Sequence, residues 1–129
     1  MQKLNGFLLL SFAALFLNGC LSASHEELLN DTWTAKGVTL SLDGEVYEVT
    51  TPLGPDKGRY EFDTSVQPHR MKIVGEEGPN KGRTIFAIYE LAEDKLKVCY
   101  NMIGSTYPES FDNGDSPSSY VINYTRKKK

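Results

Sequence analysis

Apolar and polar residues alternate with a period of two over most of the chain beyond residue 30, and this pattern predicts β-strands rather than helices. A further stretch, Thr84–Leu91, is apolar on both alternating faces, which is typical of a strand near the centre of a barrel or sandwich. In all we count seven or eight strands. The other candidate strands are Trp33–Lys36, Val38–Leu42, Glu45–Thr51, Arg59–Asp63, Met71–Val74, Lys95–Tyr100 and Tyr120–Arg126.

Turn-forming residues separate these stretches. Asp43-Gly44 is a strong signal for a two-residue hairpin turn. We expect Pro52–Gly58 to form a loop because its two prolines lack the amide hydrogens of a β-ladder, and Gly75–Gly82 to form a second, glycine-rich loop. A long polar stretch, Ser105–Ser119, precedes the last strand. Many short strands joined in this way predict an all-β fold, either a small antiparallel barrel or a meander folded as a sandwich.

The N-terminus has the pattern of a secretory signal peptide, with a basic start at Lys3 and the apolar run Phe7–Leu17. This run is too short to cross a bilayer, since a transmembrane helix needs about 20 apolar residues. Leu17-Asn18-Gly19-Cys20 resembles the lipobox of bacterial lipoproteins, which implies that Cys20 is acylated and becomes the mature N-terminus. Leu21 favours, by the same resemblance, sorting to the outer membrane. We therefore expect an exported protein, lipid-anchored in the cell envelope and facing the periplasm; the alternative is an ordinary signal peptide that leaves Cys20 as a thiol.

A short helix is expected between this leader and the first strand. Ser24 and Glu27 have the spacing of a capping box, and Leu28-Leu29 follow, so one or two helical turns should precede Trp33. The chain then divides into a signal peptide (1–19), a tether with the helix start (20–27), a β-domain (28–127) and a basic tail (128–129).

The charge and cysteine content exclude some classes of function. With 14 basic and 17 acidic side chains the formal charge is −3, and the only dense basic run is Arg126–Lys129, so we expect no nucleic-acid partner. That run is either a solvated tail or a weak contact for anionic lipid. If Cys20 is acylated, Cys99 has no partner for an intramolecular disulfide, and we expect its side chain to be packed in the core.

A succession of motifs runs along the whole β-domain. The motifs are Leu29-x-x-x-Trp33, Val38-Thr39-Leu40, Gly58-Arg59-Tyr60-Glu61-Phe62-Asp63, Gly78-Pro79-Asn80-Lys81-Gly82-Arg83, Ile88-Tyr89-Glu90-Leu91, Leu96-Lys97-Val98-Cys99, Pro108-x-x-Phe111 and Tyr124-Thr125-Arg126. This succession resembles a family of conserved hypothetical proteins that is expanded in planctomycetes. The resemblance covers about residues 28–127 and implies a lipocalin-like domain, while the function of that family is unassigned. In lipocalin-like barrels an early tryptophan closes the floor beneath an arginine of the last strand, which implies a stacked pair of Trp33 and Arg126.

Little in the sequence points to catalysis or metal binding. His69 could in principle join Ser105 or Ser110 in a triad, but no G-x-S-x-G nucleophile elbow is present, and we interpret His69 as a loop residue. Asp112-Asn113-Gly114-Asp115 lacks the spaced pattern of a calcium loop. No His or Cys cluster has zinc-ligand spacing. We therefore expect a non-enzymatic protein without a metal or cofactor.

The strand aromatics are the remaining candidates for function. Some of them must point into the barrel, where they either fill it or line a ligand cavity. We expect a lipoprotein that binds a small apolar ligand or another envelope protein through its barrel. An inhibitor or immunity-type protein that uses Pro52–Gly58 and Ser105–Ser119 against an envelope-targeted toxin or hydrolase is the alternative, and an enzyme is a second one. The candidate ligand-binding residues are Tyr47, Tyr60, Phe62, Phe86, Tyr89 and Tyr100.

Overall fold

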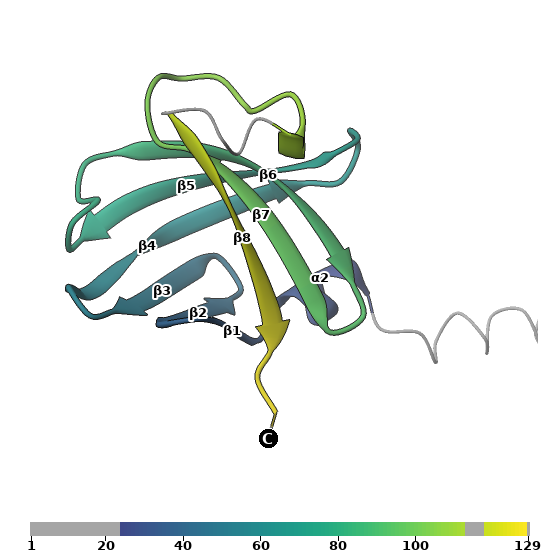
Figure 1. The fold of residues 1–129 in the computed structure, drawn as a ribbon, viewed down its shortest axis with the longest axis horizontal. Helices are drawn as coiled ribbons and strands as arrows, with labels where there is room; N and C mark the ends of the chain where they lie inside the picture. The colour runs from purple at the N-terminus through teal and green to yellow at the C-terminus, as the bar shows by residue number, and fades with distance from the viewer. Residues whose placement is uncertain (1–23, 113–117, 129) are drawn as a thin grey trace, which may run out of the picture.

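The computed structural model describes residues 24–112 and 118–128 (Figure 1). Eight strands form a closed barrel in which each strand is antiparallel to the next along the chain and the last returns to the first. The predicted all-β fold, with an antiparallel barrel and a short N-terminal helix, is confirmed, and it is consistent with a lipocalin-like barrel. The elements are α2 (His25–Leu29), β1 (Thr32–Ala35), β2 (Val38–Asp43), β3 (Val46–Thr51), β4 (Gly54–Asp63), β5 (His69–Glu77), β6 (Thr84–Ala92), β7 (Lys95–Asn101) and β8 (Ser119–Arg126).

Helix α2 begins where its sequence predicts. The Ser24 side chain accepts a hydrogen bond from the backbone amide of Glu27 at 3.1 Å, and the amide of Asn30 closes the last turn on the carbonyl of Glu26. Leu29 is its buried residue and anchors the helix to the barrel. No helix in the described ranges is long and apolar enough to cross a membrane. The expected signal peptide and Cys20 lie outside the described residues.

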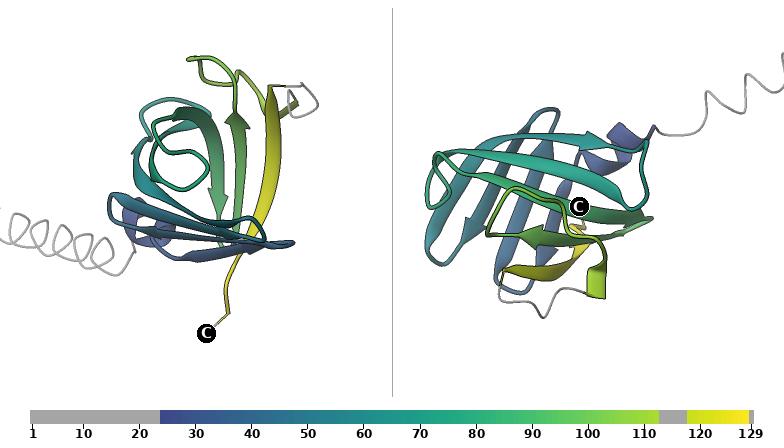
Figure 2. Two further views of the ribbon diagram at one scale, coloured as in Figure 1. Left: turned by 90° about the vertical axis from the view of Figure 1, so that its left-hand side faces the viewer. Right: turned by 90° about the horizontal axis from the view of Figure 1, so that it is seen from above.

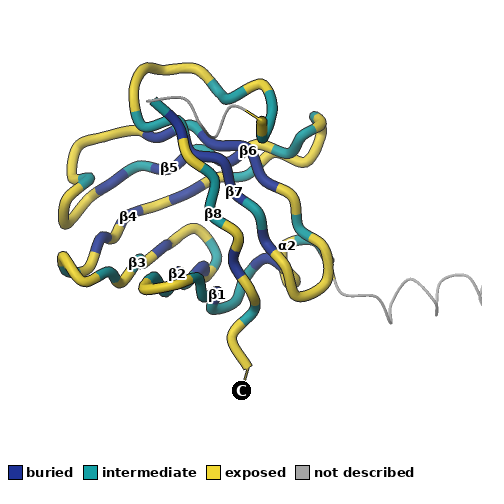
Figure 3. The backbone as a smooth tube through the Cα atoms, viewed as in Figure 1, coloured by how far each residue is buried: buried dark blue, intermediate teal, exposed yellow. Residues whose placement is uncertain are grey.

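The barrel interior is filled by alternate residues of the strands, so buried and exposed positions alternate along the tube (Figure 3). The described ends of the barrel differ. Helix α2 lies at the end that also carries the β2–β3 and β6–β7 turns, whereas the β3–β4 turn and the β5–β6 loop lie at the other end (Figures 1 and 2). The buried cluster runs between them and consists of Leu29, Trp33, Leu40, Leu42, Tyr47, Tyr60, Met71, Ile73, Ile85, Ala87, Tyr89, Leu96, Val98, Tyr100 and Tyr124.

The prediction of a loop over Pro52–Gly58 was wrong. Only Pro52 and Leu53 form a turn, and β4 begins at Gly54, which pairs with Thr51. Pro55 is tolerated within the strand because the pairing of β4 with β5 begins only at Lys57, so its missing amide hydrogen breaks no bond to that neighbour.

The glycine-rich loop expected at Gly75–Gly82 is also shorter than predicted, because β5 continues to Glu77. Gly58 and Gly75 pair with one another beside a β-bulge, and here the glycines permit close packing rather than a turn. A Cβ on Gly58 would lie 2.0 Å from the carbonyl oxygen of Val74, and one on Gly75 would lie 1.9 Å from that of Asn80. Both positions therefore exclude any side chain.

The apolar residues on the two faces of β6 pack against different parts of the molecule. Ile85, Ala87 and Tyr89 point into the barrel and belong to the buried cluster. Phe86 lies on the opposite face, where its ring packs edge-on against Tyr107 at a centroid distance of 5.0 Å. The chain after β7 arches across this outer face (Figure 1). Part of the polar stretch Ser105–Ser119 therefore covers apolar surface that a single-layer barrel would otherwise leave in water.

Candidate ligand cavity

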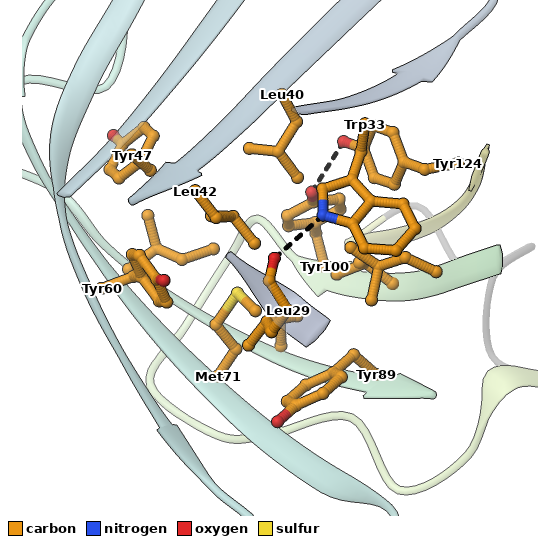
Figure 4. Packing of buried hydrophobic residues seen from close by; sticks show 14 of the residues in the cluster. Leu29, Trp33, Leu40, Leu42, Tyr47, Tyr60, Met71, Tyr89, Tyr100 and Tyr124 are labelled. Atoms are coloured by element: carbon orange, nitrogen blue, oxygen red, sulfur yellow. Dashed lines mark hydrogen bonds between the residues drawn. The ribbon is translucent and has the colours of Figure 1, made fainter. Parts of the chain in front are cut away.

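The end of the barrel that carries α2 is closed by a single tryptophan. Trp33 is completely buried, and its indole Nε1 donates a hydrogen bond to the carbonyl of Leu29 at 3.0 Å (Figure 4). The guanidinium carbon of Arg126 lies 4.4 Å from the centroid of the Trp33 ring. This is the stacking that the sequence resemblance implied for the pair, and it places both residues in the floor of the barrel.

Arg126 also joins three elements by hydrogen bonds. Its guanidinium donates to the carboxylate of Asp31 at 2.8 Å and to that of Asp94 at 3.1 Å. It donates further to the backbone carbonyls of Leu28 and Glu93 at 3.0 and 2.7 Å. The planar fork of an arginine suits such a set of acceptors. The floor is thus fixed by one side chain that links α2, the β6–β7 turn and the start of β1, where β1 and β8 share only two residue pairs.

A cavity of about 220 Å³ occupies the other half of the barrel interior. Its wall is predominantly aliphatic and includes Leu42, Val49, Met71, Ile73, Ile85 and Ile122. An apolar cavity of about 150 Å³ accommodates benzene, so a cavity of this size accommodates a molecule of roughly nine carbon atoms. The barrel is therefore neither fully packed nor as open as a typical drug-sized pocket of about 300–1,000 Å³.

Tyrosines supply most of the polar groups in the cavity wall. The hydroxyls of Tyr100 and Tyr124 are hydrogen-bonded to each other at 2.8 Å (Figure 4), and that of Tyr60 donates to the side-chain oxygen of Asn30 at 2.7 Å. Burial raises the pKa of Tyr60 and of Tyr124 to about 12, and it raises the pKa of Tyr100 well above its usual value. These side chains are consequently neutral hydrogen-bonding groups at any physiological pH.

One carboxylate, that of Asp56, also contributes to the wall. Its side chain is only 7% exposed and accepts hydrogen bonds from the amide and the side chain of Asn80 at 3.2 and 2.9 Å. The Tyr47 hydroxyl donates to it at 3.3 Å, and burial together with this carboxylate raises the pKa of Tyr47. The close approach of Gly78, where a Cβ would lie 2.4 Å from the carbonyl of Pro55, lets the β5–β6 loop reach Asp56.

The structure places the sequence candidates in three environments. Tyr47, Tyr60 and Tyr100 line the cavity, Phe62 and Tyr89 lie nearer the α2 end, and Phe86 faces outward against Tyr107. Sequence reasoning missed Asp56 because its segment was interpreted as a loop. It also missed Tyr120 and Tyr124, although their spacing in the last predicted strand puts both on one face.

The interpretation of His69 as a loop residue was wrong. His69 begins β5, and its ring lies 5.3 Å from that of His25 in α2. Its Nδ1 is hydrogen-bonded to the carbonyl of Val66 at 3.0 Å, not to Ser105 or Ser110. His25 Nε2 is hydrogen-bonded to the Tyr89 hydroxyl at 2.8 Å, and burial together with His69 lowers the pKa of His25. The pair thus fixes α2 to the barrel wall.

The surroundings of Cys99 make it a structural residue rather than a reactive one. Cys99 is completely buried, and burial raises the pKa of its thiol, the opposite of what a nucleophilic cysteine requires.

Among residues 24–112 and 118–128, no group of three His, Cys, Asp or Glu side chains could hold a metal ion. Asp115 of the possible calcium loop lies outside those ranges.

Comparison with known proteins gives no relative: no family model matches the chain, and no curated protein or solved structure matches it either.

Proposed function

We propose that this protein is a non-enzymatic lipoprotein of the cell envelope that holds a small apolar molecule inside its barrel. The cavity of about 220 Å³, with its aliphatic wall, is the observation that carries the proposal. Leaving the apolar wall of such a cavity without a ligand costs free energy, because its surface is then exposed to water or to empty space. A ligand that fills the cavity recovers part of that free energy as affinity.

The position of the lipid-attachment candidate supports an orientation for the barrel. Ser24, the first described residue, lies at the N-cap of α2 and therefore at the closed end. Three residues separate it from Cys20, and a fully extended chain of that length reaches at most about 14 Å. If Cys20 is acylated, the closed end stays near the membrane surface, here proposed to be the outer membrane, and the cavity end is directed toward the periplasm.

Native mass spectrometry tests the proposal directly. The protein is purified gently from its own host, and its mass is recorded before and after extraction with organic solvent. We expect an adduct of low mass that solvent removes, together with the covalent mass of the Cys20 lipid. A bare polypeptide mass before extraction, repeated over independent preparations, would contradict the proposal of a tightly held ligand.

A matched pair of variants locates the adduct. Val49 lines the cavity, whereas its neighbour Thr50 is exposed on the outer face of β3. We expect Val49→Phe to remove the adduct by filling the space, while Thr50→Phe retains it. Equal retention in both variants would place the bound molecule elsewhere on the protein.

A second candidate function is protein binding at the rim of the cavity end, as in the inhibitor or envelope-partner hypotheses. Leu53, in the β3–β4 turn, is 90% exposed, and Ile103, after β7, is 65% exposed. Exposed apolar residues at the edge of a cavity are suited to contact with another macromolecule. Co-purification of a stoichiometric protein that is lost in Leu53→Ser/Ile103→Ser would favour this candidate.

A further inference from the structure

The hydroxyls of Tyr100 and Tyr124 in the cavity wall carry one hydrogen more than their mutual hydrogen bond uses. Tyr100 is 8% and Tyr124 is 2% exposed, and their hydroxyls are hydrogen-bonded to each other. Each hydroxyl carries one hydrogen, and their mutual bond uses only one of the two. Neither oxygen has another hydrogen-bond partner among the described residues. One buried donor therefore remains, in side chains that line the cavity.

A buried donor without an acceptor is costly, about 1–3 kcal/mol, so an acceptor brought by the ligand has a large effect. Tyr60 shows the contrast: its side chain also lines the cavity, but its hydroxyl hydrogen is already bonded to Asn30. Tyr47 is likewise occupied, since it donates to Asp56. Tyr120 also lines the cavity, but it is 45% exposed, so its hydroxyl is accessible to water. The Tyr100–Tyr124 pair is thus the buried place in the wall where a ligand oxygen finds a donor.

The charge of the wall restricts the ligand further. Asp56 is the one ionisable carboxylate that lines the cavity among the described residues, and no Lys or Arg side chain lines it there. Arg83, at the end of the β5–β6 loop, is exposed and donates to the side chain of Asn80 and to the carbonyl of Met102. A ligand carboxylate would have to be desolvated beside a negative group with no cation in the wall to compensate.

From these two features we infer that the cavity selects a neutral apolar molecule that bears a hydrogen-bond-accepting oxygen, such as a ketone, an ester or an ether, and rejects carboxylates. The oxygen accepts the free hydrogen of the Tyr100–Tyr124 pair, and the hydrocarbon part packs against the aliphatic wall. This inference rests on the proposed function, since it names the ligand class of the same cavity.

Three seven-carbon probes test this selectivity: heptane, heptan-2-one and heptanoate. Binding is measured on the full chain from the chemical shifts of the methyl groups of Met71, Ile73 and Ile85, which line the cavity. We expect heptan-2-one to bind about 3–10-fold more tightly than heptane, the effect of one buried hydrogen bond. We expect heptanoate to bind at least about 100-fold more weakly than the ketone.

Variants at Tyr100 and Tyr124 test whether their hydroxyls cause the preference for the ketone. In Tyr100→Phe/Tyr124→Phe the ratio of ketone to heptane affinity should fall below one, because the ketone oxygen loses its hydrogen bonds to water and finds no donor in the cavity. In the matched control Tyr60→Phe the ratio should stay as in the natural protein, because that hydroxyl offers no free hydrogen. In Asp56→Asn the affinity for heptanoate should rise relative to that for the ketone.

The possible outcomes separate the two proposals. Equal binding of heptane and heptan-2-one by the natural protein, or heptanoate binding as tightly as the ketone, would overturn the selectivity and leave the carrier function standing. No shift of any cavity methyl with any probe would overturn both. The comparison of probes on the natural chain decides the question even if the double variant does not fold.

Discussion

The two ends of the barrel are built on opposite principles. At the α2 end, a buried tryptophan is stacked on an arginine whose guanidinium is hydrogen-bonded to two carboxylates and two carbonyls. At the other end, aliphatic side chains and tyrosines surround a cavity of about 220 Å³. The comparison teaches that a small barrel can keep an internal void when its closure is concentrated at one end.

Truncation of the floor should have the largest effect. Trp33→Ala removes a fully buried indole, and we expect it to lower the free energy of unfolding by about 3–5 kcal/mol. Leu53→Ser at the cavity rim should change it by less than about 0.5 kcal/mol, because that side chain is 90% exposed. Chemical denaturation measures both. Similar losses in the two variants would contradict the division of roles.

The pairing within the floor has its own test in a double-mutant cycle of Trp33→Ala and Arg126→Ala. We expect a coupling free energy of about 0.5–2 kcal/mol, the range for a cation–π contact. Purely additive losses would show that the two residues stabilise the floor independently of each other.

At the cavity end, a glycine pair distinguishes packing from backbone strain. Gly78 and Gly82 both have positive φ angles, +93° and +82°, but only Gly78 lies against other atoms, those of Pro55 and Asp56. We expect Gly82→Ala to cost about 1 kcal/mol and Gly78→Ala to cost about 2–3 kcal/mol, with weaker ligand binding in the latter alone. Equal losses in stability and binding would show that the β5–β6 loop does not depend on its contact with Asp56.

High pH should weaken the barrel through its buried tyrosines. The pKa of Tyr60 and of Tyr124 is raised from 10 to about 12 by burial in the folded state. Each contribution is fully present below pH 10 and is lost as the pH rises toward 12, since the unfolded chain releases these protons first. The loss amounts to about 2 kcal/mol per tyrosine. Denaturation curves recorded from pH 9 to 12 should show it, and Tyr60→Phe should reduce it.

Acidification should have the smallest effect, confined to the α2 end. The pKa of His25 is lowered in the folded state by burial and by His69, so its contribution is present above its unfolded pKa of about 6.5 and is lost as the pH falls through the lower folded value. Denaturation curves recorded between pH 7.5 and 5 should show a decline in the free energy of unfolding. His25→Gln should abolish this decline, and a decline that persists in the variant would assign it to other groups.

Several elements were predictable because local signals and the fold agree there. The alternation in Val38–Leu42 and in Lys95–Tyr100 predicted β2 and β7 to within one residue at the ends, and the spacing of Ser24 and Glu27 predicted the start of α2. Around Gly58 and Gly75 the same kind of reasoning failed. Glycine favours a turn when considered locally, but here it is required by the close contact of two strands, and that contact exists only after folding.

The candidate site was predictable only in part for a similar reason. Strand alternation indicates which aromatics share a face, but it does not show which face is inside when both are apolar, as on β6. Phe86 was therefore included as a candidate and lies outside. The burial of Asp56 could not be predicted from the sequence, because it depends on hydrogen bonds from Asn80, which lies in a loop 24 residues later in the chain.

By itself the sequence determined the all-β class, the short helix and most of the strands, because periodicity, capping and turn residues act over a few neighbouring positions. Only the tertiary structure decided the closure of β8 onto β1, the coverage of the outer face of β6 and the opening of a cavity at one end. These depend on how side chains far apart in the chain fill a common volume. The hydroxyl pair of Tyr100 and Tyr124 is the clearest case, since nothing in the sequence indicates that these two side chains meet, and their hydrogen bond leaves one hydroxyl hydrogen free in the cavity wall.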